Sequence, residues 1–255
     1  MTELLGTDRM ANYGLAHGAM LVVTVLSCVV SLWWLRRLRA RGGPTAVHRV
    51  MRTAGWVFLI MTLLWAGWRL LPENFSVSSS LPLQFSDALR FIVAIALIWR
   101  VRWAVAVSFY WGLTLNLQSL ITPDLTYGPF PWLSFSAFWV LHIVVFAVPV
   151  LFLFVDGYRP TWPDFSVTYL ITLGWAAVAM TVNALTDTNY GYLNGAPESA
   201  SILDVLGPWP LYIVSVAVLV AAVWALMTWP FTSQHRYRRR RRHLLQGGRT
   251  GAARR

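Results

Sequence analysis

The sequence has few charged residues, one cysteine and no lysine. Charged residues make up 12% of the 255 positions and hydrophobic residues 57%, a balance that excludes a water-soluble globule. The single cysteine, Cys28, excludes a disulfide framework or a cysteine metal cluster within the chain. The sequence also lacks the Walker, dinucleotide-binding, zinc-binding and GxSxG motifs. We therefore expect neither a metal nor a cofactor.

Long apolar runs account for most of the chain. A helix that crosses the hydrocarbon core of a bilayer needs about 20 residues. Seven such segments are predicted, at residues 11–35, 53–71, 83–99, 103–121, 134–155, 167–186 and 208–230. The predicted fold is an all-α polytopic membrane protein. It consists of a seven-helix bundle over residues 11–230, a short segment at 1–10 and a basic tail at 231–255.

The arginines indicate how this bundle is oriented. All except Arg9, Arg69 and Arg90 lie in the loop after the first predicted span, in the loop after the third, in the loop after the fifth and in the tail. The positive-inside rule places these regions in the cytoplasm, so the N-terminus is predicted outside and the C-terminus inside. We expect a multi-pass protein of the plasma membrane. Basic residues that are all arginine, with abundant alanine, valine and glycine, are typical of a GC-rich bacterial genome.

The tail contains a run of five arginines, Arg238 to Arg242, shortly after the last predicted span. Guanidinium groups bind any polyanion, and nucleic acid is one alternative. A run at the membrane border more simply binds anionic lipid headgroups, at about 1 kcal/mol per residue. The predicted partners are therefore membrane lipids, with anionic headgroups at the tail, and not nucleic acid.

Ionisable side chains stand in the first half of the third predicted span. Asp87 and Arg90 lie one helical turn apart, and Gln84 and Ser86 fall on the same face of that helix. Charged groups are costly in hydrocarbon, so they favour a functional site. The alternative is an ion pair that only fixes how the helix packs.

Other polar residues share this predicted depth. His142 lies about two turns below the outer end of the fifth span, where the alternative role is an interhelical hydrogen bond. Five further polar residues lie at this depth or in the loop above it: Asn116, Gln118, Asn183, Asn189 and Tyr190. The sequence therefore predicts a polar cavity in the outer half of the bilayer, around His142 and the Asp87/Arg90 pair.

An ordered series of blocks over about residues 55 to 230 resembles the YwaF-like bacterial integral membrane proteins. The blocks are LPLQFSD (81–87), YWG (110–112) with QSLITPDL (118–125), His142, DGYRPTW (156–162), Asn183 with TNY (188–190), and LD (203–204) with LGPWP (206–210). Eukaryotic relatives of that family are lipid acyltransferases. They place polyunsaturated acyl chains on ether phospholipids and use a cysteine and a histidine within the membrane.

This resemblance implies roles for individual residues. His142 matches the family histidine, Ser86 stands at the cysteine position, and Gln84 stands where many bacterial members have histidine. A serine next to a base can form an acyl intermediate, although it needs stronger activation than cysteine. His142 would be the base, and Asp87 would orient it or pair with Arg90.

Two functions are consistent with these residues. The first is a lipid acyltransferase whose catalytic residues are Ser86, His142 and Asp87. Its expected substrate-binding residues are Gln84, Arg90, Asn116, Gln118, Asn183, Asn189 and Tyr190. The alternative is a transporter or binding protein for a small polar or lipidic ligand. A transporter requires a polar path to the cytoplasmic side, and the sequence shows no inner half of such a path and no repeated broken-helix pattern.

Overall fold

The computed structural model describes residues 10–127, 130–195 and 205–252, with side chains of the last helix as far as Ser233. Over these residues the chain is helical and has no β-strand, as predicted. In order, the elements are α2 (Leu15–Leu70), α3 (Phe85–Trp99), α4 (Arg102–Leu113), α5 (Leu115–Ile121), α6 (Pro131–Leu151), the π-helical turn η1 (Phe152–Asp156), α7 (Trp162–Thr186), the 3-10 turn η2 (Tyr190–Tyr192) and α8 (Leu211–Ala252). The segment 1–9 and the side chains of the arginine run lie outside the described residues.

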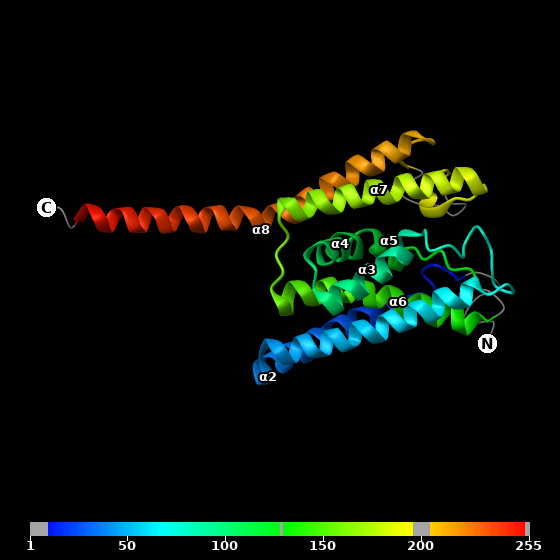
Figure 1. The fold of residues 1–255 in the computed structure, drawn as a ribbon, viewed down its shortest axis with the longest axis horizontal. Helices are drawn as coiled ribbons and strands as arrows, with labels where there is room; N and C mark the ends of the chain where they lie inside the picture. Colours follow the sequence, from blue (N-terminus) through cyan, green and yellow to red (C-terminus); the bar gives the residue numbers. More distant parts are fainter. Residues whose placement is uncertain (1–9, 128–129, 196–204, 253–255) are drawn as a thin grey trace.

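The long helix α2 is a hairpin of two antiparallel arms (Figure 1). Gly43 leaves the helical region with φ 69° and ψ −175°, and Pro44 follows it. Glycine adopts positive φ without the steric cost that a Cβ brings. Proline at the start of the second arm loses no hydrogen bond, because the first amides of a helix have no partner within it. The chain therefore reverses direction here almost without a loop.

Five helices are long and apolar enough to cross a membrane: Leu15–Leu70, Arg102–Ile121, Pro131–Asp156, Trp162–Thr186 and Leu211–Ser233. The prediction had seven spans, and the difference has two sources. The first two predicted spans are the arms of α2, which are joined through Gly43. The third corresponds to α3, whose 15 residues are shorter than the roughly 20 that a full crossing needs. Five apolar helices of this length support a multi-pass membrane protein.

The fourth predicted span, 103–121, was expected to be one helix, and the structure corrects this. The chain breaks at Thr114, where φ is −124° and ψ is −74°, between α4 and α5. The Thr114 hydroxyl donates to the Tyr110 carbonyl at 2.5 Å and accepts the indole N–H of Trp224 at 3.0 Å. Hydroxyl bonds of this kind satisfy main-chain groups that a broken membrane helix leaves free. The break is therefore held in place by α8.

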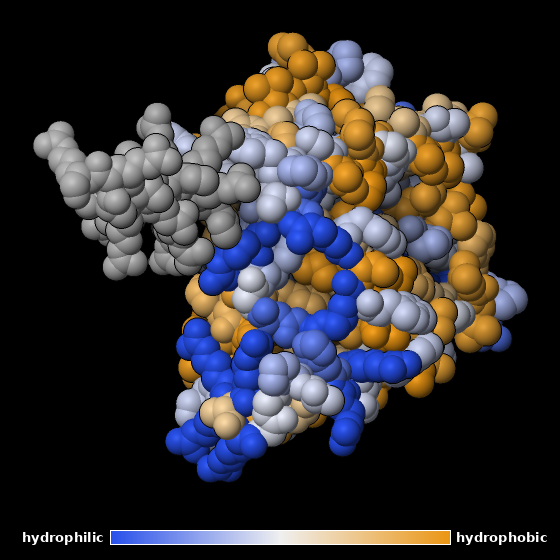
Figure 2. Space-filling view, turned by 60° about the vertical axis from the view of Figure 1, so that its left-hand side comes forward, coloured by the Kyte–Doolittle hydropathy of each residue, from blue (hydrophilic) through white to orange (hydrophobic). Residues whose placement is uncertain are grey.

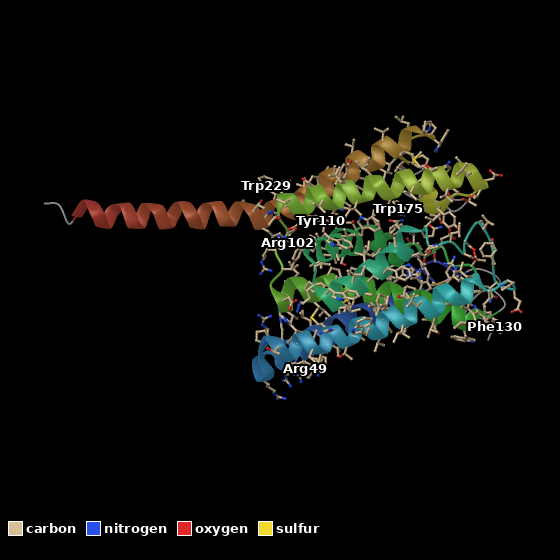
Figure 3. The ribbon with its side chains drawn as sticks, viewed as in Figure 1. Arg49, Arg102, Tyr110, Phe130, Trp175 and Trp229 are labelled. Carbon is tan, nitrogen blue, oxygen red and sulfur yellow. The ribbon has the colours of Figure 1, made fainter. Side chains whose placement is uncertain are left out.

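The arginine-bearing turns and the longer loops lie at opposite ends of the bundle. Figure 3 places Arg49 and Arg102 toward one end and Phe130 at the other. At the first end, Asp156 pairs with Arg100, with His48 at 3.8 Å and with Arg39 at 4.0 Å. This contact joins the tip of α2 to the ends of α3 and η1. We call this side the arginine end and the opposite side the loop end.

The helices between these ends pack around an apolar core from α2, α3, α4 and α6. A glycine permits a close approach between α4 and α6. A Cβ on Gly112 would lie 2.6 Å from the carbonyl oxygen of Val145, so only glycine fits there without movement of the main chain. Gly112 thereby sets the distance between the helices that lead to Asn116 and His142.

Candidate functional site

A buried charge cluster joins α3 to the second arm of α2. Asp87 Oδ1 lies 2.5 Å from Arg90 Nη2, and Asp87 Oδ2 lies 3.5 Å from Arg69 Nη1. The side chains of Asp87 and Arg90 are only 7% and 9% exposed. Two guanidinium groups thus share one carboxylate, which leaves the cluster with a net positive charge. The predicted Asp87/Arg90 pair is present, and Arg69 joins it.

A narrow pocket opens beside this cluster. Its volume is about 250 Å³ including the space open at its mouth, and Thr62, Trp65, Arg69, Ser80, Asp87 and Arg90 contribute to its lining. Two buried polar atoms of these residues have no hydrogen-bond partner, Thr62 Oγ1 and Arg90 Nε, while Asp87 Oδ2 makes only the ion pair with Arg69. An unsatisfied polar atom is costly when it is buried. The pocket is therefore suited to a polar group of a ligand or to water.

The imidazole of His142 presents one free nitrogen. His142 is 4% exposed and stacks on Phe138, with ring centroids 4.1 Å apart. Its Nδ1 lies 2.7 Å from the Phe138 carbonyl oxygen. Because a carbonyl oxygen can only accept, Nδ1 carries the proton and Nε2 bears the lone pair. Within the described part of the chain, Nε2 makes no hydrogen bond.

One predicted site residue lies next to His142. Asn116 of α5 donates from Nδ2 to the His142 carbonyl at 3.1 Å, and its own Oδ1 is buried without a partner. The break at Thr114 begins the short helix that carries Asn116. The structure therefore places Asn116 against His142 and Arg90 against Asp87. Neither His142 nor Asn116 is among the described residues that line the pocket beside Asp87.

The second buried histidine at the loop end provides a contrast. His17 Nδ1 accepts the main-chain N–H of Tyr13 at 2.9 Å, and its Nε2 lies 2.9 Å from the carbonyl oxygen of Leu120. Both ring nitrogens are therefore engaged, and the residue ties the first arm of α2 to α5. His142 differs because its Nε2 has no hydrogen-bond partner among the described residues, so this nitrogen can accept a proton.

Ser86 is half-buried at the start of α3. Ser86 lies one helical turn before Arg90, which places it near the face of α3 that carries Arg90. Among the described residues, its hydroxyl makes no hydrogen bond, with His142 or with any other side chain. The contact that a serine nucleophile forms with its base is thus not made in this conformation. Catalytic hydrogen bonds are often long in a protein without substrate.

The other predicted binding residues hold the loops together. Gln84 Oε1 accepts the N–H of Gly191 at 3.0 Å. Asn183 bonds both main-chain groups of Tyr190, at 2.7 and 3.0 Å. The Tyr190 hydroxyl accepts from Leu81 N at 3.1 Å and donates to the Val77 carbonyl. None of these bonds reaches Asp87, Arg90 or His142.

The last two predicted binding residues also bond locally. Asn189 Nδ2 donates to the Gly195 carbonyl at 2.8 Å. Gln118 is exposed and donates to the Thr122 hydroxyl at 2.5 Å. A role in binding substrate stays a prediction for both residues. Over the described ranges, no group of three or more acidic, histidine or cysteine side chains is arranged to hold a metal ion.

Sequence reasoning did not assign Arg69 or Thr62 to the site. A signal for Arg69 was present, because it is an arginine on the predicted outer side, where the positive-inside rule expects few. An arginine that departs from the rule needs a partner, and Asp87 supplies it. Thr62 lies in an apolar stretch and carries no such signal.

Comparison with protein-family models gives a match over most of the chain. The model of the TMEM164 family, a family of transmembrane proteins, matches residues 12–228. That range contains the charge cluster, the pocket and His142, and it ends before the arginine run. No curated protein and no solved structure matches the chain.

Proposed function

The chain belongs to the TMEM164 family, and we propose that it transfers acyl chains to or from phospholipid at the loop end of the bundle. The observation that carries this proposal is the buried imidazole of His142. Its Nδ1 proton is fixed by the Phe138 carbonyl, and its Nε2 has no partner among the described residues. A positioned, unprotonated imidazole is the commonest general base in enzymes.

The proposed step is the exchange of one ester for another. His142 Nε2 takes the proton of an attacking hydroxyl, whose oxygen bonds to the acyl carbonyl carbon. The carbonyl oxygen becomes negative, and the unpaired N–H of Arg90 is suited to stabilise it. The ester C–O bond then breaks, and the leaving oxygen takes the proton from His142. Asp87 contributes by holding Arg90 in place.

The attacking hydroxyl belongs either to Ser86 or to the acceptor lipid. If it is Ser86, the acyl chain rests on the serine before the acceptor hydroxyl removes it in a second exchange of the same kind. If it is the acceptor, one exchange completes the reaction. Ser86→Cys distinguishes these routes, because a thioester forms on position 86 only if this residue is the nucleophile. Cysteine also stands at this position in the family that the sequence resembles.

We expect Ser86→Cys to transfer acyl chains at least as fast as the parent chain, because a thiolate is the better nucleophile. The parent for this test carries Cys28→Ser, so that position 86 holds the single thiol. The protein is incubated in phospholipid nanodiscs with a fluorescent acyl donor, and a hydroxylamine-sensitive thioester on position 86 is sought by mass spectrometry. Retained transfer in Ser86→Ala together with no thioester in Ser86→Cys would contradict the acyl-enzyme route. Absence of any transfer by the parent would contradict the proposed function.

We also propose that the chain crosses the plasma membrane seven times, with the arginine end in the cytoplasm. This count treats the arms of α2 as two crossings and α3 as a short one, which local thinning of the bilayer accommodates. A membrane-impermeant thiol reagent applied to intact cells tests the orientation after Cys28→Ser. We expect Glu73→Cys to be labelled and Arg41→Cys to be protected. The reverse pattern would overturn the orientation.

The alternative function, transport, needs a polar route between the two ends of the bundle. Between them lies a large cluster of buried apolar side chains that includes Val93, Leu97 and Val145. The single broken helix at Thr114 has no counterpart that would make a repeated pair in the described part of the chain. These observations do not favour the alternative over acyl transfer.

A further inference from the structure

A second pocket lies at the arginine end, far from His142 in the fold. It is formed by the end of α3, the start of α4 and the segment that follows η1. Its volume is about 910 Å³ including the space open to the outside. Figure 2 shows this face of the molecule, where an arc of hydrophilic side chains surrounds a hollow.

The rim of this pocket carries an excess of positive charge. Arg100, Arg102 and Arg159 line it, and Arg39 adjoins it through Asp156. These four guanidinium groups face two carboxylates. Asp156 is shared by Arg39 and Arg100, and Asp164 binds Arg102 at 2.8 and 2.6 Å. An excess of two positive charges within one pocket matches a dianion.

The crowding of these charges affects Arg100. Burial lowers the pKa of Arg100 from its ordinary value, and the positive charge of Arg39 lowers it further. The Nη1 group of Arg100 is buried and has no hydrogen-bond partner. A bound anion would supply that partner. Its negative charge would also reduce the repulsion between Arg100 and Arg39.

Five other arginines near the tip of α2 do not line this pocket: Arg36, Arg37, Arg41, Arg49 and Arg52. Topology requires only that arginines be present on one side of the membrane. It does not require three of them to line one pocket, so this convergence needs a separate explanation.

The pocket combines donors with an apolar floor. Phe152 and Val105 are buried beneath the arginines, and the Arg100 guanidinium lies 5.6 Å from the centroid of the Phe152 ring. Arg159 uses Nη1 to bond the carbonyls of Leu153 and Tyr158, at 2.9 and 2.7 Å. The planar fork of a guanidinium matches the paired oxygens of a phosphate group.

We propose that this pocket binds a phosphate monoester, either the terminal phosphate of a lipid headgroup or that of a small soluble molecule. Basic pockets between membrane helices on the cytoplasmic side are suited to lipid phosphates. This inference does not rest on acyl transfer at the loop end, because no residue is shared between the two sites.

The test uses the full chain in phosphatidylcholine nanodiscs that contain either phosphatidic acid, a monoester, or phosphatidylserine, an anionic diester. We expect phosphatidic acid to be retained in native mass spectrometry and to raise the thermal midpoint more than phosphatidylserine does. Arg159→Gln and Arg100→Lys each remove one donor fork, and we expect each to weaken retention about tenfold. Arg100→Lys keeps the charge beside Asp156, so it separates phosphate geometry from folding.

Arg41→Gln is the matched control, because it removes one exposed arginine of the same end of the bundle. We expect it to leave retention unchanged. Competition by millimolar glycerol 3-phosphate supports the site and assigns it to a soluble phosphate, whereas retention without competition supports a lipid headgroup. Equal retention of phosphatidylserine, or equal losses in Arg41→Gln and the two pocket variants, would overturn the proposal.

Discussion

Replacing His142 by glutamine is expected to reduce acyl transfer by about 10²–10⁴-fold, the range typical for loss of a general base. Glutamine is close in size, and its amide N–H can still donate to the Phe138 carbonyl that now binds Nδ1. It has no group that takes a proton at neutral pH. The variant therefore keeps the buried hydrogen bond but cannot act as a general base. Initial rates in nanodiscs, normalised to folded protein, measure the effect.

His17→Gln is the control for this prediction. His17 lies at the same end of the bundle, is fully buried and uses both ring nitrogens for structural bonds. We expect this variant to be less stable but to retain its rate per folded molecule. If both variants lost activity to the same extent, His142 would be a structural residue. Full activity in His142→Gln would remove the base from the proposed mechanism.

Replacing Asp87 by alanine is expected to lower the free energy of unfolding by about 3–5 kcal/mol, the cost of removing one partner of a buried ion pair. Arg90 is 9% exposed, and without the carboxylate its charge would stay buried beside Arg69. The shift in unfolding midpoint during titration with sodium dodecyl sulfate measures the loss. We also expect acyl transfer to fall, because Asp87 positions Arg90.

The double variant Asp87→Leu with Arg90→Leu shows whether the loss comes from the uncompensated charge. Replacing a whole buried pair by apolar side chains is often neutral or stabilising. We expect the double variant to be more stable than Asp87→Ala and still inactive, while Arg69, at 22% exposure, turns outward. A double variant as unstable as the single one would show that the pair itself holds α3 in place.

Local patterns in the sequence were sufficient for the helices and for part of the candidate site. The Asp87/Arg90 pair follows from helical spacing alone, and the structure shows it at 2.5 Å. The shared depth of Asn116 and His142 was predicted from span boundaries, and the two residues are in contact. In both cases, the position along a helix decides which residues meet.

Contacts that depend on how helices are placed beside each other were not predictable in this way. Arg69 reaches Asp87 across a loop of irregular structure. The break at Thr114 follows Gly112 by two residues, and it is held by a hydrogen bond from Trp224, 110 residues away in sequence. The convergence of Arg39 and Arg100 on Asp156 likewise joins three separate turns.

The reversal at Gly43 bears on how the protein enters the membrane. Two apolar arms joined by almost no loop can partition into the bilayer together, since each covers part of the other as soon as both have left the ribosome. The tip between them carries Arg39, Arg41 and Arg49, and these charges oppose passage through hydrocarbon. We therefore expect the first two helices to insert as one unit whose tip resists crossing the bilayer, before Asp87, Arg90 and His142 have been synthesised.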